Sequence, residues 1–224
     1  MFLKQNLLTP CCINCGSFFV EEHLFCADCF KSRLQININS CPEFSEYEES
    51  KHVYLIDWQK NQSESLDQLV YRLKCDNSVL AIENYANLLG EKLNSVLDLK
   101  EYSALIPIPS ANVKSVHAHL IAACLSVKVK LPVYDILTKA AASPSQKKLT
   151  AVERKTQNPF SLKLELAEDF TRFKEVQKTQ ALSCIFVDDV MTTGQSFKRC
   201  SEALIGSKRN AIATLFYRPS LIPH

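Results

Sequence analysis

Apolar residues follow two alternating patterns along most of the chain. Short runs rich in β-branched and aromatic residues, typical of buried strands, alternate with stretches in which apolar residues recur at the spacing of an amphipathic helix. Strands are expected at residues 53–58, 105–110, 131–137, 184–187 and 211–217, the first as a candidate edge strand. Helices are expected at residues 66–73, 79–93, 113–125 and 197–204. This alternation predicts an α/β domain with a parallel sheet, flanking helices and right-handed crossovers.

The first forty residues lack this alternation and carry two closely spaced pairs of cysteines. Cys12 and Cys15 form the first pair, Cys26 and Cys29 form the second, and ten residues separate the pairs. Four thiolates at this spacing can complete the closed tetrahedral coordination that is typical of structural zinc. A segment so short and poor in apolar residues cannot fold unaided, so the metal would supply its stability. Cys11 also lies within usable spacing of Cys15, and Cys12 is preferred because it makes the two pairs symmetrical.

These patterns divide the chain into three expected parts. Residues 1–40 form a small N-terminal zinc finger, residues 41–52 an exposed acidic linker or turn, and residues 53–224 the α/β domain. Cys41 has no partner at the spacing of the other pairs, and we expect it to be a lone thiol.

Composition and charge narrow the classes of function. The 224 residues are 46% apolar and 22% charged, as in ordinary globular proteins, and the net charge of +2 provides no global basic field for nucleic acid. The N-terminus does not resemble a signal peptide, and no apolar run is long enough to cross a bilayer. We therefore expect a cytoplasmic protein with no membrane partner. In that compartment ten cysteines favour metal binding and buried thiols over disulfides.

The segment after the strand at 184–187 combines two acids with small hydroxyl side chains. It reads Asp188, Asp189, Val190, Met191, Thr192, Thr193, Gly194, Gln195 and Ser196. Open α/β sheets bind ligands at the carboxyl ends of their strands, where the two acids are expected. The hydroxyls, the permissive backbone of glycine and the start of a helix suit a phosphate group, and the two carboxylates suit the diol of a sugar. The sequence therefore predicts a site for a phosphorylated ribose.

This segment resembles the motif with which type I phosphoribosyltransferases bind phosphoribosyl pyrophosphate (PRPP). The resemblance implies that Asp188 and Asp189 hold the ribose hydroxyls beside the reacting carbon, as the candidate catalytic residues, and that 191–196 surround the 5-phosphate. It also implies that the loop after the strand at 105–110 binds the pyrophosphate together with Mg²⁺. Because Pro109 has no N–H group, Ser110 and the residues after it would supply the donors.

The order of motifs along nearly the whole chain is similar to that of ComF-type competence proteins. These motifs are the four-cysteine finger, Leu73-Lys74 at a helix end, the Ile-Pro-Ile-Pro strand end, the Gln146, Leu149, Arg154, Asn158 and Phe160 pattern, and the two acids. The resemblance implies a zinc finger joined to a phosphoribosyltransferase-like domain. It implies a role in natural transformation, in which the protein handles single-stranded DNA in the cytosol, often beside a competence helicase. A basic loop with Lys147, Lys148 and Arg154 is the candidate contact with DNA, or a flap over PRPP.

Two functions follow from this resemblance. The first is a DNA-uptake factor that binds PRPP without turnover, and the second is an active phosphoribosyltransferase of nucleotide salvage with an unidentified acceptor. Relatives carry Arg-Gly-Phe-Asn-Gln after the Pro-x-Pro strand end, where this chain has residues 113–117, Val-Lys-Ser-Val-His. Loss of that arginine and asparagine argues against turnover more than against PRPP binding, and favours the first function.

Overall fold

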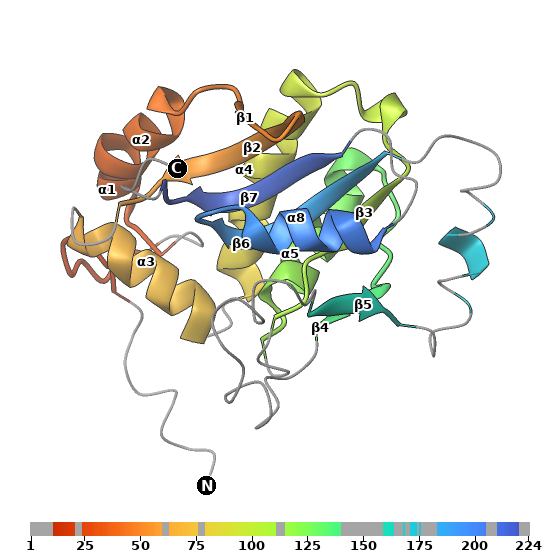
Figure 1. Cartoon of the computed structure of the whole chain (residues 1–224). Coiled ribbons are helices and arrows are strands. Elements are labelled where there is room, and N and C mark those ends of the chain that lie inside the picture. The colour runs from red at the N-terminus through yellow and green to blue at the C-terminus, as the bar shows by residue number, and fades with distance from the viewer. Residues whose placement is uncertain are drawn as a thin grey trace, which may run out of the picture.

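The computed structural model describes residues 11–20, 24–59, 63–75, 79–110, 115–139, 159–163, 168, 171–173, 175, 183–204 and 210–219. In this part of the chain five strands form one mainly parallel sheet, with helices on both sides (Figure 1). The predicted fold class, α/β with a parallel sheet flanked by helices, is confirmed at this level.

The sheet has the strand order β1-β2-β7-β6-β3. Its strands are β1 (Ser45–Tyr47), β2 (Ser50–Asp57), β3 (Ala104–Pro107), β6 (Cys184–Met191) and β7 (Ala211–Tyr217). Strands β2, β7, β6 and β3 run parallel, and β1 pairs antiparallel with the outer side of β2. The strand predicted at 53–58 is therefore an interior strand, and the prediction of an edge position is wrong.

Four helices of eight or more residues cover the two faces of the sheet in the described part of the chain. They are α3 (Glu64–Cys75), α4 (Val79–Val96), α5 (His117–Val129) and α8 (Gln195–Ala203). The first three share one hydrophobic cluster with one face of the sheet, while α8 belongs to the cluster on the opposite face (Figure 1).

The apolar run that predicted strand β6 is explained by its burial on both faces of the sheet. Ile185 and Val187 belong to the cluster with α3, α4 and α5, whereas Cys184 and Phe186 belong to the cluster with Phe197 of α8. Residues 184–187, the first four of β6, are completely buried. A strand that is covered on both faces has no polar side to alternate with its apolar side, which accounts for the continuous apolar run.

Residues 41–52 differ from the expected exposed linker because they contribute two strands of the sheet. Strand β1 and the start of β2 form a hairpin whose two turn residues, Glu48 and Glu49, have φ of 45° and 66°. Two consecutive positive φ angles are what a two-residue type I′ turn requires. The expected turn is therefore present. It joins β1 to the first residues of β2, which the short polar sequence around the turn did not predict to be strands.

Two further predictions need correction between residues 113 and 139. The expected strand at 131–137 is reduced to a single bridge from Val133 to Leu105, followed by β4 (Leu137–Lys139), which pairs antiparallel with β5 (Phe160–Leu162) in a separate small sheet. The helix expected at 113–125 begins at residue 117 and continues to residue 129. Residues 111–114 lie outside the described part of the chain.

The N-terminal segment packs on the same core as the sheet. It contains the short helices α1 (Ala27–Cys29) and α2 (Gln35–Ser40), with a π-helical turn at Phe30–Leu34 between them. Phe25 and Leu34 are 1% exposed and belong to the cluster that includes α3, α4 and α5.

Helix α2 is also tied to the end of β2. The Asn37 side-chain amide donates to the Asp57 carbonyl oxygen at 3.1 Å, and its oxygen accepts from the Asp57 N–H at 3.2 Å. The Asp57 N–H also lies 3.2 Å from Cys41 Sγ. These bonds link the cysteine-rich segment directly to the sheet.

None of the helices in the described residues combines the length with the apolar character that crossing a bilayer requires.

Candidate functional site

The candidate site lies where β6 continues beyond its neighbour β3. Pairing between these strands ends at Val187 and Pro107, while β6 remains paired with β7 as far as Met191. Asp188 and Asp189 therefore lie inside the strand and not after it, at the point where the edge next to β3 becomes open. The loss of the neighbouring strand leaves room for a cavity of about 530 Å³ beside the two acids.

Residues from six parts of the chain line this cavity, which brings together several of the predicted site residues. Ser110, Asp188, Asp189 and Ser196 belong to the predicted site, while Lys74, Ser115, His117 and Lys139 were not assigned to it. Ile108, Pro109 and Ala118 complete the lining. Lys147, Lys148 and Arg154 lie outside the described residues, so their predicted roles remain predictions.

Asp188 is the more enclosed of the two acids. Its Oδ1 accepts a hydrogen bond from the backbone N–H of Asp189 at 2.8 Å. Burial raises the pKa of the Asp188 carboxyl well above its ordinary value, and the neighbouring charge of Asp189 raises it further. A group of this kind gains most from a ligand that supplies hydroxyl donors or positive charge, because either favours the ionised form.

Asp189 is held by an ion pair that joins α3 to β6. Its Oδ2 lies 3.2 Å from Nζ of Lys74, and the two side chains are 20% and 42% exposed. Because alternate side chains of a strand point to opposite faces, Asp189 follows Val187 toward α3 and α5, while Asp188 follows Phe186 toward α8. Both carboxylates still reach the cavity, since it extends around the end of β3.

The segment after the acids encloses a second, smaller cavity of about 50 Å³. It is lined by Asp188, by every residue from 190 to 197, and by Ile108, Ile212 and Thr214. One water needs only about 10–15 Å³ of such space, so a small polar group fits. Helix α8 begins at Gln195, directly after Gly194, whose φ of 70° is in the left-handed region that glycine favours. Residues 191–196, which the sequence predicts to surround a phosphate (the phosphate segment), thus form a tight turn at the start of a helix.

The unassigned cavity residues add positive charge and an imidazole. Lys139 is the last residue of β4, and its Nζ lies 4.9 Å from the centre of the ring of Phe160, its partner on β5. His117 is only 9% exposed, and its Nδ1 has no hydrogen-bond partner among the described residues. Lys74 ends a predicted helix, but nothing in its local sequence indicates that it reaches Asp189. These residues come together only through the packing of α3, α5 and β4 around the sheet.

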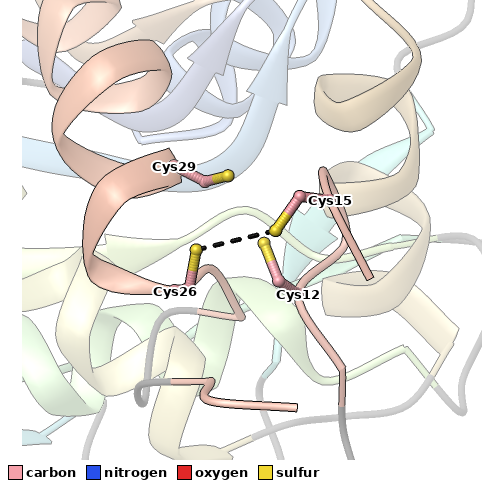
Figure 2. Close-up of side chains that lie close together, drawn as sticks. All are labelled: Cys12, Cys15, Cys26 and Cys29. Atoms are coloured by element: carbon pink, nitrogen blue, oxygen red, sulfur yellow. Dashed lines mark hydrogen bonds between the residues drawn. The ribbon is translucent and has the colours of Figure 1, made fainter. Parts of the chain in front are cut away.

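A second candidate site is the group of four cysteines near the N-terminus. The sulfur atoms of Cys12, Cys15, Cys26 and Cys29 lie within 4.8 Å of one another and point toward a common centre (Figure 2). The sulfurs of Cys15 and Cys26 lie 3.7 Å apart. Tetrahedral coordination with metal–sulfur bonds of about 2.3 Å requires sulfurs roughly 3.8 Å apart, so the group could hold a structural metal such as zinc.

The surroundings of these sulfurs suit a cation. Burial raises the pKa of the Cys12 thiol, but backbone N–H groups of Cys26, Cys15 and Asn14 outweigh it and lower that pKa to about 6. The Asn14 side-chain amide donates to Cys29 Sγ at 3.2 Å, while burial and the neighbouring thiols raise the Cys29 pKa to about 12. Four thiolates this close repel one another, and a divalent cation removes that repulsion. Cys11 is exposed and is not part of the group, so the geometry favours Cys12.

Comparison of the chain with models of known protein families and with curated proteins finds no match.

Proposed function

We propose that this protein is a ComF-type competence factor that binds PRPP at the cavity beside β6 and acts in DNA uptake in the cytoplasm. One observation carries the proposal of PRPP binding: Ser110, Asp188, Asp189 and Ser196 line a single cavity, although they come from two distant motifs. Its volume, about 530 Å³, lies within the range of roughly 300–1,000 Å³ that is typical of small-molecule sites. The proposal thus includes a phosphoribosyltransferase-like domain.

In this proposal the ligand spans both cavities. The 5-phosphate occupies the small cavity formed by residues 190–197, where backbone N–H groups at the start of α8 and the hydroxyls of Thr192 and Ser196 can donate to it. The ribose diol lies against Asp188 and Asp189, whose carboxylates accept its hydroxyl hydrogens.

The pyrophosphate lies in the larger cavity near Ser110. The side chains of Lys74 and Lys139 line this cavity and can offset its negative charge. Mg²⁺ bound with PRPP would supply further positive charge to the pyrophosphate oxygens. Because Lys74 is paired with Asp189 before the ligand arrives, binding would require it to share its charge between the carboxylate and the pyrophosphate.

Titration calorimetry with PRPP and Mg²⁺ tests the proposed site. Wild-type protein should bind PRPP, and Asp188→Asn and Asp189→Asn should each weaken binding while leaving the folded state intact by circular dichroism. Asp98→Asn is a matched control, because Asp98 caps a 3₁₀ turn away from both cavities. Unchanged affinity in both site variants would show that PRPP, if it binds, binds elsewhere.

We propose zinc as the metal of the four-cysteine group, and single-stranded DNA as a partner. For DNA, the candidate contacts are Lys147, Lys148 and Arg154. Replacing all three by alanine should weaken binding of an oligonucleotide, and affinity should fall as salt increases, because released counterions drive such binding. Deleting the gene and measuring transformation with foreign DNA tests the role in uptake.

An active phosphoribosyltransferase is the second candidate, and the lining of the larger cavity favours it. Beyond the acids, the cavity has His117 and Ser115 in its wall, which are polar groups that an acceptor could contact. In the transfer the bond between the anomeric carbon and the pyrophosphate oxygen breaks, a bond to the acceptor forms with inversion, and the acceptor loses a proton. Pyrophosphate release with a panel of nucleobases and amines separates the candidates, since turnover with any of them would favour the enzyme.

A further inference from the structure

Tyr47 contacts the phosphate segment from the outside. It ends strand β1, and its hydroxyl donates a hydrogen bond to the backbone oxygen of Thr193 at 3.0 Å, across 146 positions of sequence. Its ring also packs edge-on against Phe197, with centroids 6.0 Å apart. Tyr47 lines neither of the two cavities, so it can influence a ligand only through the segment that it touches.

The ring also lies directly against the backbone of Gly194. A Cβ atom at Gly194 would lie 2.2 Å from Cζ of Tyr47 and within 2.7 Å of two further ring atoms. Real Cβ atoms do not approach other atoms so closely, so the tyrosine ring occupies the space that any other residue at 194 would need. Residues 193, 194 and 197 therefore all contact the side chain of Tyr47.

The turn of the hairpin makes a further contact with the same helix. Glu48 Oε1 lies 2.7 Å from Lys198 Nζ, and the two side chains are 46% and 42% exposed. An exposed pair of this kind contributes little stability by itself. Its position shows, however, that the hairpin touches α8 as well as the segment before it.

The hydrogen bond from Tyr47 determines where the next N–H group points. In a trans peptide the carbonyl oxygen of one residue and the N–H of the next lie on opposite sides of the chain. Since the Thr193 oxygen is held toward Tyr47, the N–H of Gly194 points away from it. Thr193 and Gly194 both line the small cavity, where an anion could receive that N–H, while Tyr47 does not line it. Donors fixed before binding cost less ordering when the ligand arrives.

We propose that Tyr47 is a positioning residue of the phosphate subsite: it holds the Thr193–Gly194 peptide so that its N–H faces the small cavity. This inference rests on the proposed function, because it names the 5-phosphate as the group that the subsite receives. It adds the β1–β2 hairpin, which the sequence presented as a linker, to the structure that supports the site.

The test uses Tyr47→Phe, which removes the hydroxyl and keeps the ring on Gly194 and Phe197. Tyr134→Phe is the matched control, because Tyr134 is buried against Phe173 and lines neither cavity. Hydrogen exchange is measured on peptides that cover 191–197 in the unliganded protein. Affinities are measured by calorimetry for ribose 5-phosphate and, separately, for pyrophosphate with Mg²⁺. Thermal unfolding of each variant monitors the fold.

We expect Tyr47→Phe to speed exchange in 191–197 and to weaken ribose 5-phosphate binding by about 2- to 10-fold, the usual effect of one hydrogen bond. Pyrophosphate affinity and the melting temperature should stay close to wild type, and Tyr134→Phe should change none of the ligand readouts. Wild-type exchange and wild-type ribose 5-phosphate affinity in Tyr47→Phe would overturn the inference. So would an equal loss of both ligands together with stability, because that pattern describes a general structural role.

The exchange measurement separates this inference from the proposed function. If wild-type protein binds neither ribose 5-phosphate nor PRPP, the proposed function fails and with it the named ligand of the subsite. Faster exchange in Tyr47→Phe would still support the hold on the peptide. Unchanged exchange would overturn the positioning role, whatever the protein binds.

Discussion

Replacing Asp188 by asparagine should stabilise the unliganded protein at neutral pH, although it should weaken PRPP binding. Burial and the charge of Asp189 raise the pKa of the Asp188 carboxyl well above its ordinary value, and Lys74 offsets this only in part. At neutral pH this acid therefore opposes folding. The amide of asparagine carries no charge, and its oxygen can still accept the 2.8 Å hydrogen bond from the Asp189 N–H.

The magnitude follows from linkage between protonation and folding. At a pH between the ordinary carboxyl pKa, about 3.9, and the raised folded value, the folded protein keeps a proton that the unfolded chain has released. Stability contributed by this group is therefore full below that window and is lost as pH rises through it. Each unit by which the pKa is raised corresponds to about 1.4 kcal/mol. For a chain of this length, each kcal/mol changes the melting temperature by about 2–4 °C.

Thermal unfolding of wild type and Asp188→Asn between pH 4 and pH 8 measures the effect. We expect the variant to melt a few degrees higher at pH 7.5, with the difference closing toward pH 4. Asp189→Asn is the comparison variant: it removes the repulsion that Asp189 exerts on Asp188, but it also loses a partly exposed ion pair with Lys74, worth at most about 1 kcal/mol, so it should gain less than Asp188→Asn. A less stable Asp188→Asn at pH 7.5, or a difference that does not depend on pH, would refute the reasoning.

Three other predictions test the remaining parts of the structure. Cys26→Ser should lose bound zinc in elemental analysis, whereas Cys11→Ser should retain it, and retention in both would mean that the ligands are assigned wrongly. Gly194→Ala should lower the free energy of unfolding by about 1–2 kcal/mol for the left-handed backbone alone, and further because of Tyr47; a wild-type denaturation midpoint would contradict this. Burial and the charge of Lys92 lower the pKa of His52 to about 3, so its contribution to stability should increase with pH from about 3 to its unfolded value near 6.5. His52→Gln should flatten that dependence in urea unfolding, and an unchanged slope relative to wild type would count against it.

The sequence predicted the elements whose buried residues follow a local pattern, either a continuous apolar run or a stripe at helical spacing. Ile185 and Phe186 are covered on opposite faces, which produces an apolar run, and α4 shows the same helical stripe in its sequence and in its buried residues. The four cysteines were found because the spacing of metal ligands is local to the chain.

Other features depend on packing between distant segments, and local patterns do not carry them. Strand β1 has only three residues and no apolar alternation, and its turn uses two glutamates where glycine or asparagine would have signalled a hairpin. Lys74, His117 and Lys139 reach the larger cavity from three separate elements. Their side chains are ordinary for a helix end, a helix start and a strand end, so only the folded arrangement reveals their proximity.

The two hydrogen bonds between Asn37 and Asp57 couple the four-cysteine segment to the rest of the domain. They attach α2 to the last residue of β2, while Phe25 and Leu34 insert into the layer beneath the sheet. Loss of a metal bound by the four cysteines would therefore lower the stability of the whole domain, and would not simply unfold one end of an otherwise intact protein.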